Sequence, residues 1–141
     1  MSIQQAIITL VGAIISGVLA TYITLAVNKR DEKIRVRQQL VDDIFGYKYQ
    51  LSDSTGVTQI LDINSKGFVR ALNRIPIIFW EDAKVLNAYD KFYDTLSIAD
   101  EQERKEKSDE ELINLLKALC KASKIDCDNW NDSRFKRVFK I

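Results

Sequence analysis

The chain of 141 residues contains no histidine, one proline and two cysteines, and these scarcities exclude several kinds of chemistry. Histidine is the side chain that most often shuttles protons near neutral pH and most often binds zinc, so hydrolytic triads that need histidine are excluded. The sequence also lacks a glycine-rich phosphate loop and the spacing of a nucleophile elbow. We therefore expect no catalytic residues, no cofactor, no metal site and no enzymatic activity.

The two cysteines, Cys120 and Cys127, are too few for a four-cysteine metal site. In a reducing cytosol they are expected to remain thiols in or beside the core, without forming a structural disulfide. Neighbouring carboxylates such as Asp42–Asp43 and Glu81–Asp82 diverge by about 100° on a helix, so they do not converge on one substrate atom. We interpret them as solvated faces and helix starts.

Charge is absent from residues 1–28, and this absence predicts a membrane span. The run from Ala6 to Val27 would be about 33 Å long as a helix, which matches the hydrocarbon core of a bilayer, about 30 Å thick. A basic cluster follows at once: Lys29, Arg30, Lys33, Arg35 and Arg37. Because positive residues are retained on the cytoplasmic side, we expect the amino terminus outside and the rest of the chain in the cytoplasm.

The basic cluster and the apolar run each have a second interpretation. The cluster fixes topology in our main interpretation, and it can also bind anionic lipid head groups. The apolar run could instead be a cleaved secretory signal, which would need a basic segment before it, a shorter apolar core and a small-x-small cleavage site. Only Leu25–Ala26 offers a weak processing site, so we favour the span.

Small residues recur four apart inside the predicted span. Gly12 pairs with Ser16 and Ala13 pairs with Gly17, and Ala20 extends these rows. Small residues at this spacing let helix backbones approach closely, so the pattern predicts self-association into a homo-oligomer. The alternative is that such residues are simply common in membrane spans.

Polar residues on one face of the span suggest a different function. Gln5, Thr9, Ser16 and Thr24 lie on one drifting face, which could line a narrow polar path if several copies assemble. In the opposing interpretation each hydroxyl bonds back to its own helix. The alternative function is therefore a pore-forming effector that depolarises the membrane.

The segment after the span is predicted to continue the same helix. Apolar residues recur at helical spacing from 34 to 51, which predicts one rod from about residue 4 to about residue 50. A turn is expected at Ser52–Gly56, where residues that compete for the backbone are dense. We divide the chain into a transmembrane helix at 1–28, a juxtamembrane helix at 29–51 and a cytoplasmic helical domain at 52–141.

The remaining segments predict a small all-α domain. A brief helix should end near Asn73, and Ile75–Pro76 should impose an extended entry into a buried apolar loop that reaches Trp80. A second helix should begin at Glu81 or Asp82. Its apolar stripe is Ala83, Leu86, Tyr89, Phe92, Tyr93 and Leu96.

The carboxyl-terminal third predicts two more helices. The charged segment 99–107 is expected to be an exposed connection or a solvated helix extension. Ser108 and Glu111 make a capping box before an apolar stripe that runs from Leu112 to Ala122. Aromatic residues in 125–141 suggest a final short helix that folds back onto the core.

Net charge does not require a nucleic-acid partner. The formal net charge is +1 at pH 7, and the basic aromatic run 134–140 is better explained as a solvated edge of the core. We therefore expect membrane lipid, further copies of the chain and a cytoplasmic protein as partners, and nucleic acid to be an unlikely one.

Several apolar segments resemble a known protein group. The segments 68–73, 75–80, 88–92 and 112–119 follow the membrane helix in an order that is similar to a bacterial domain-of-unknown-function family of small membrane-anchored proteins. The resemblance covers most of the chain after about Arg37 and implies bacterial origin and an anchored helical domain. It supplies no catalytic residues. Residues 132–141 depart from the aromatic, proline-containing end of that family.

These observations lead to one functional hypothesis. We expect a single-pass protein of the bacterial inner membrane that self-associates through its span and binds a partner or a small signal with its cytoplasmic domain. Its architecture also suggests a component of a bacterial or phage conflict system, an extension that rests on architecture alone.

Overall fold

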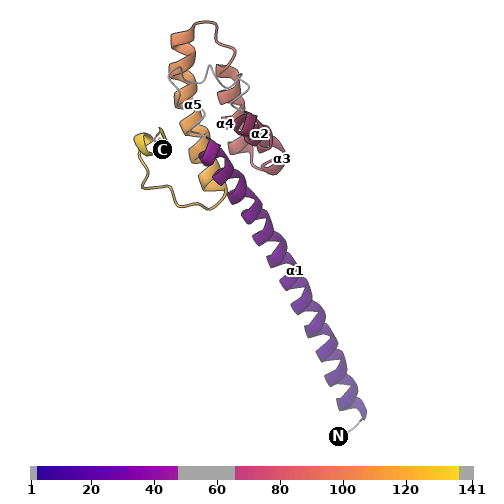
Figure 1. Ribbon diagram of the computed structural model, residues 1–141. Helices are drawn as coiled ribbons and strands as arrows, with labels where there is room; N and C mark the ends of the chain where they lie inside the picture. The colour runs from indigo at the N-terminus through magenta and orange to yellow at the C-terminus, as the bar shows by residue number, and fades with distance from the viewer. Residues whose placement is uncertain (1–2, 48–65, 137–141) are drawn as a thin grey trace. The chain divides into compact units, whose positions relative to one another are not determined.

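The computed structural model describes residues 3–47 and 66–136 (Figure 1). Every regular element in these residues is a helix, which confirms the predicted all-α fold. The helices are α1 (Ile3–Tyr47), α2 (Lys66–Asn73), α3 (Ile75–Ile78), α4 (Ala83–Thr95), α5 (Glu101–Ala122) and α6 (Asp132–Lys136). The predicted turn at Ser52–Gly56 lies outside the described residues.

The chain divides into two compact units, Met1–Ile34 and Arg35–Ile141. Helix α1 runs through the boundary without interruption, as the continuous helical pattern predicts. The first unit contains the apolar part of α1 and the charged residues 29–33, and none of its described side chains is buried except for partial burial at Ile34. The second unit contains the hydrophobic core.

The last turns of α1 form one wall of that core. Leu40, Val41 and Ile44 are buried together with residues of α2 to α6, because their spacing places all three on one face of the helix. Asp43 forms an ion pair with Arg74, with 3.1 Å between Oδ2 and Nη1. The predicted apolar positions after residue 40 are therefore core residues of the second unit.

Helix α3 corrects the prediction for the segment around Pro76. The extended entry is absent, and Ile75–Ile78 forms one helical turn in which the Phe79 N–H donates to the Ile75 carbonyl at 2.9 Å. Proline is tolerated there because backbone N–H groups in a first turn have no partner within the helix. The turn buries Ile75 and Phe79 but leaves Ile77 and Trp80 exposed, so only part of the predicted apolar loop is buried.

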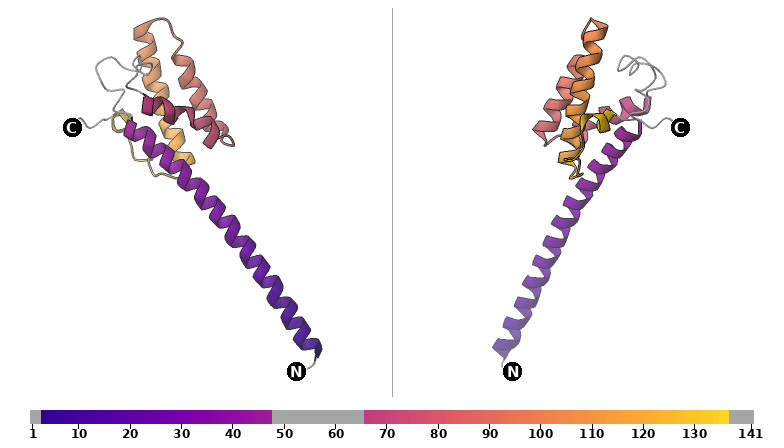
Figure 2. Two further views of the ribbon diagram at one scale, coloured as in Figure 1. Left: turned by 45° about the vertical axis from the view of Figure 1, so that its right-hand side comes forward. Right: turned by 90° about the vertical axis from the view of Figure 1, so that its left-hand side faces the viewer.

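Helices α4 and α5 pack against each other as an antiparallel pair, side by side in both views of Figure 2. Asp82 caps α4 as predicted, since its carboxylate accepts from the Val85 N–H at 3.2 Å. Val85 and Phe92 enter the core, whereas Tyr93 from the predicted stripe is exposed. The stripe is therefore rotated slightly from the predicted one.

Helix α5 begins earlier than the predicted capping box. Asp100 is the cap, and its Oδ1 accepts from the Glu103 N–H at 2.7 Å. Ser108 lies inside the helix, where its hydroxyl is buried and donates to the Arg104 carbonyl at 2.5 Å. The charged segment is thus a solvated helix extension, which was one of the two predicted states.

Helix α6 brings aromatic side chains back to the core, as predicted. Phe135 is buried, and its ring centroid lies 5.4 Å from that of Trp130. The Phe45 ring of α1 lies 5.9 Å from Trp130 in an edge-to-face arrangement. Through this aromatic cluster, α6 packs against the last turns of α1.

Candidate functional site

The apolar surface of α1 is the first candidate site. None of its most apolar 18-residue window is buried, and its length and composition are sufficient to cross a membrane. A shallow concave surface of about 480 Å³ follows the small residues Ala13, Gly17 and Thr21. It is flanked by Ile14, Val18, Tyr22 and Leu25. Helix α1 therefore offers an exposed surface that another helix could enter.

Only part of the predicted association set lines this surface. Ala13 and Gly17 do, whereas Gly12, Ser16 and Ala20 lie outside it. A Cβ atom added at Gly12 or at Gly17 would meet nothing within 4 Å. Both glycines therefore leave open space that no described residue of the chain fills.

The hydroxyl groups of the predicted pore face all donate to their own helix. Thr9 donates to the Gln5 carbonyl at 2.9 Å, Ser16 to Gly12 at 2.9 Å and Thr24 to Ala20 at 2.8 Å. These bonds agree with the interpretation in which each hydroxyl bonds back to its own helix. Because the hydroxyl protons are used inside the helix, this face would offer hydrogen-bond acceptors to a permeating ion but few donors. The pore stays a prediction.

The basic cluster has two different environments. Lys29, Arg30, Lys33 and Arg35 are exposed, as residues that contact lipid head groups would be. Arg37 instead belongs to the folded second unit. Its side chain is half-buried, in contrast to the other four members of the cluster.

Arg37 joins α1 to the end of α5. Its Nη1 donates to the Ala122 carbonyl at 3.2 Å, and its guanidinium lies 4.8 Å from the centroid of the Phe79 ring. The neighbouring Gln38 donates to the Ser123 carbonyl at 3.0 Å. A cation at the carboxyl end of a helix is favoured by the helix dipole. The signal was present in the sequence, because Arg37 precedes the buried Leu40 by three residues and so shares its helix face.

The carboxyl end of α5 forms the second candidate site. The Ile125 N–H donates to the Cys120 carbonyl at 2.9 Å, and the Lys124 N–H donates to Lys121 at 3.2 Å. Lys124 has a positive φ of 56°. These are the bonds of a Schellman motif, in which the chain reverses direction after a residue in the left-handed conformation. This motif was not predicted, because glycine usually occupies the left-handed position and a lysine stands there in this chain.

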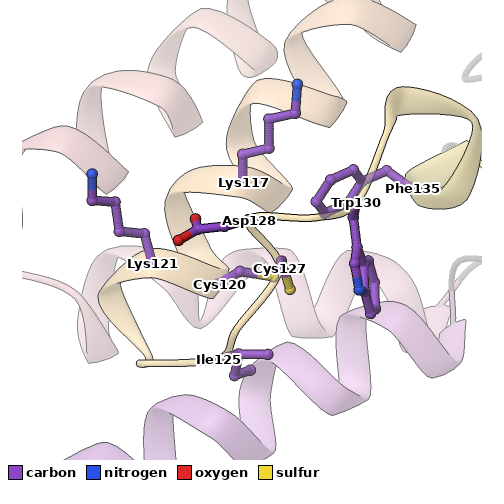
Figure 3. Close-up of a pocket in the computed structure, with 8 residues that line it drawn as sticks. All are labelled: Lys117, Cys120, Lys121, Ile125, Cys127, Asp128, Trp130 and Phe135. Atoms are coloured by element: carbon purple, nitrogen blue, oxygen red, sulfur yellow. The ribbon is translucent and has the colours of Figure 1, made fainter.

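The reversal places Cys127 beside Cys120 in a cavity of about 260 Å³ (Figure 3). The other lining residues are Lys117, Lys121, Ile125, Asp128, Trp130 and Phe135. Both cysteines are buried and free, which confirms the prediction of thiols in the core. Lys117 Nζ lies 2.7 Å from Asp132 Oδ1, so this ammonium group is paired with α6.

Burial raises the pKa of the Cys120 thiol above its ordinary value of 9.0, and the Cys127 side chain raises it further by hydrogen bonding. A thiol with a raised pKa is a poor nucleophile near neutral pH, because the thiolate is the reactive form. Among the described residues, no three histidine, cysteine, aspartate or glutamate side chains gather where they could hold a metal ion. The cavity is therefore lined by charged as well as apolar side chains, and it contains a dithiol in which Cys120 is weakly acidic.

Residues 1–131 match a family of unknown function, DUF6680. The chain belongs to this family. The predicted resemblance to a family of unknown function is confirmed to that extent, and bacterial origin and membrane anchoring stay predictions. No curated protein and no solved structure matches the chain.

Proposed function

We propose that this protein of the DUF6680 family is a single-pass membrane protein whose helical domain lies in the cytoplasm. The exposed apolar surface of α1 is the observation that supports this proposal. A soluble protein buries such a helix in its core, whereas here the whole window is exposed. Large exposed apolar surfaces mark membrane or partner contacts, and the length fits a bilayer. In the proposal the membrane is the bacterial inner membrane.

Fractionation tests the anchor. After expression in a bacterium and alkaline carbonate washing, we expect the full-length chain in the membrane pellet with an intact mass. Proteases added to inverted vesicles should digest the domain, because the basic cluster retains it in the cytoplasm. A shortened soluble product would support a cleaved signal, and an intact chain in the supernatant would contradict the anchor.

The proposal includes self-association through the span, on the surface that contains Ala13 and Gly17. The matched test compares Gly17→Leu with Gly12→Leu, because both glycines have open space and only Gly17 lines the concave surface. A leucine side chain at Gly17 would block the close approach of a second helix, so we expect Gly17→Leu to weaken association about tenfold, or by about 1.4 kcal/mol. Energy transfer between labelled chains in vesicles measures this. Equal loss in both variants would contradict this choice of surface, and no loss in either would contradict self-association.

In this proposal the cytoplasmic domain is a binding module without catalysis. The cavity at the end of α5 is where a small signal would fit, and the domain surface is available to a protein partner. A role as a component of a bacterial or phage conflict system belongs to the same proposal. Turnover of a nucleotide or lipid by the purified full-length chain would contradict the non-enzymatic part.

A further inference from the structure

Two large apolar side chains are exposed in and just after α3. Ile77 is 74% exposed and Trp80 is 67% exposed, and they stand three residues apart. Ile77 lies in α3, and Trp80 follows the C-cap residue Phe79 in the turn that leads to α4. The alternating neighbours Ile75 and Phe79 are fully buried. We name Ile77 and Trp80 the α3 patch.

The core holds the α3 patch in place. Phe79 is fixed between the core and the Arg37 guanidinium, and the Asp82 N–H donates to the Phe79 carbonyl at 2.8 Å. Asp82 then caps α4. The backbone on both sides of Trp80 is therefore held by the fold, and its exposure follows from that fixed backbone.

Charges near the α3 patch are mixed. Arg74 is paired with Asp43, and the Asp82 carboxylate is occupied by the Val85 N–H. Glu81 and Lys84 add one exposed charge of each sign. Electrostatic attraction alone would give little preference for an anionic surface. An apolar contact with a polar rim suits the interfacial zone of a bilayer, where tryptophan is enriched.

The length of the chain limits how far the patch can be from the membrane. Arg37 touches Phe79 and stands nine residues after Asn28, the last residue before the basic cluster. Even a fully extended segment of that length spans at most about 30 Å. The patch is therefore tethered close to the bilayer at any angle between the two units. A protein partner that is free in solution would have to compete for the patch with the bilayer, which the tether always keeps nearby.

We propose that the α3 patch is a second, peripheral contact with the bilayer, in which Ile77 and Trp80 enter the headgroup region beside the span. This inference rests on the proposed membrane anchor. Its contact is apolar, so it should depend only weakly on salt and on the fraction of anionic lipid. The contact would restrict the orientation of the cytoplasmic domain.

Tryptophan fluorescence of the full-length chain in vesicles tests the proposal. Trp130→Phe leaves Trp80 as the single indole, because the chain has two tryptophans. We expect brominated acyl chains to quench its emission, a shift of the emission to shorter wavelength, and protection from aqueous iodide. The vesicles contain phosphatidylcholine and phosphatidylglycerol, with bromine close to the headgroup.

Two matched variants serve as controls. Trp80→Phe leaves Trp130, which is half-buried in the aromatic cluster and reports that the domain is folded. Tyr93→Trp, combined with Trp80→Phe and Trp130→Phe, places an indole at a site that is 59% exposed near the other end of α4. That indole should remain accessible to iodide. If Trp130→Phe prevents folding, fluorine resonances of 5-fluorotryptophan in the unaltered chain, with a lipid-soluble paramagnet, provide the same measurement.

The outcomes separate the patch from the anchor. Quenching of Trp80 by brominated lipid, with Tyr93→Trp unaffected, supports the proposal. Quenching of Trp80 by iodide, in a chain that still floats with the vesicles, overturns the patch and leaves the anchor intact. Protection from both quenchers would also overturn it, because protein would then cover the patch. A chain that does not float with the vesicles overturns the anchor itself.

Discussion

The two parts of α1 place similar side chains in opposite environments. Ile14 in the first unit is 58% exposed, whereas Ile44 in the second unit is fully buried. Both residues lie on one continuous helix, so helix formation does not explain the difference. Ile44 has a core to enter, and Ile14 has none among the residues that the structure describes. In our account lipid supplies the missing apolar surroundings of the first part.

Charge in the middle of the predicted span should produce the largest effect, which is a loss of membrane integration by the first part of α1. An arginine at the centre of a membrane helix costs about 2.5–3.5 kcal/mol, and each substitution also removes an apolar side chain. Ile15→Arg combined with Val18→Arg should therefore abolish membrane integration, while the fold of the domain is kept. Carbonate extraction and circular dichroism measure the two effects. Retention of the double variant in the membrane pellet would contradict the account.

Truncation of one isoleucine in each part of α1 should have a smaller effect. It should lower the stability of the domain when the isoleucine lies in the second part and not when it lies in the first. Ile44→Ala should destabilise the domain by about 2–5 kcal/mol, because it removes fully buried atoms and leaves a cavity. Ile14→Ala should leave the domain unchanged, because its side chain touches no core. Urea unfolding of the full-length chain in detergent, followed by tryptophan emission, compares them. Equal destabilisation by both variants would show that the first part packs against protein.

The core thiol makes the stability of the domain depend on pH. Because burial raises the pKa of Cys120 in the folded state, the unfolded chain releases this proton at a lower pH than the folded chain does. The stabilisation is fully present below the ordinary thiol pKa and is lost as pH rises above it, with a slope of at most about 1.4 kcal/mol per pH unit. Unfolding midpoints between pH 8 and pH 10 measure the slope.

Cys120→Ala is the control for this pH dependence. It removes the titrating group, so the slope over the same pH range should flatten although the variant is less stable overall. A slope that is the same in both proteins would assign the pH dependence to another group. Tyr89, whose pKa burial also raises, would contribute only above about pH 10.

The smallest effect concerns the start of α5. Asp100→Ala should cost about 1 kcal/mol, because it removes the side chain that caps the first turn. Ser108→Ala should cost less, since the Ser108 hydroxyl bonds back within the helix and caps nothing. Unfolding midpoints of the two variants measure which substitution lowers the stability of the domain more. A larger loss for Ser108→Ala would contradict the expectation that the Asp100 cap contributes more to stability than the Ser108 hydroxyl.

The same comparison explains what could be predicted from the sequence. The uncharged run and the periodic positions around Leu40 and Phe92 predicted α1 and the core-facing residues, because their patterns are local. The Schellman turn at Lys124 could not be predicted, since a lysine occupies the left-handed position that glycine usually takes. The exposure of Trp80 also depends on tertiary structure, because Ile75 and Phe79 occupy the core side of the turn. Arg37 shared the face of Leu40 and could have been assigned to the core.

Photolabelling from lipid tails tests the central claim most directly. The full-length chain is reconstituted in vesicles whose acyl chains carry a photoactivatable group, irradiated, digested and analysed by peptide mass mapping. The account predicts labels between Ala6 and Val27 and none on the core residues Leu40 to Ile44. Absence of label from the first segment, with the chain present in the vesicles, would contradict the claim that lipid solvates these side chains.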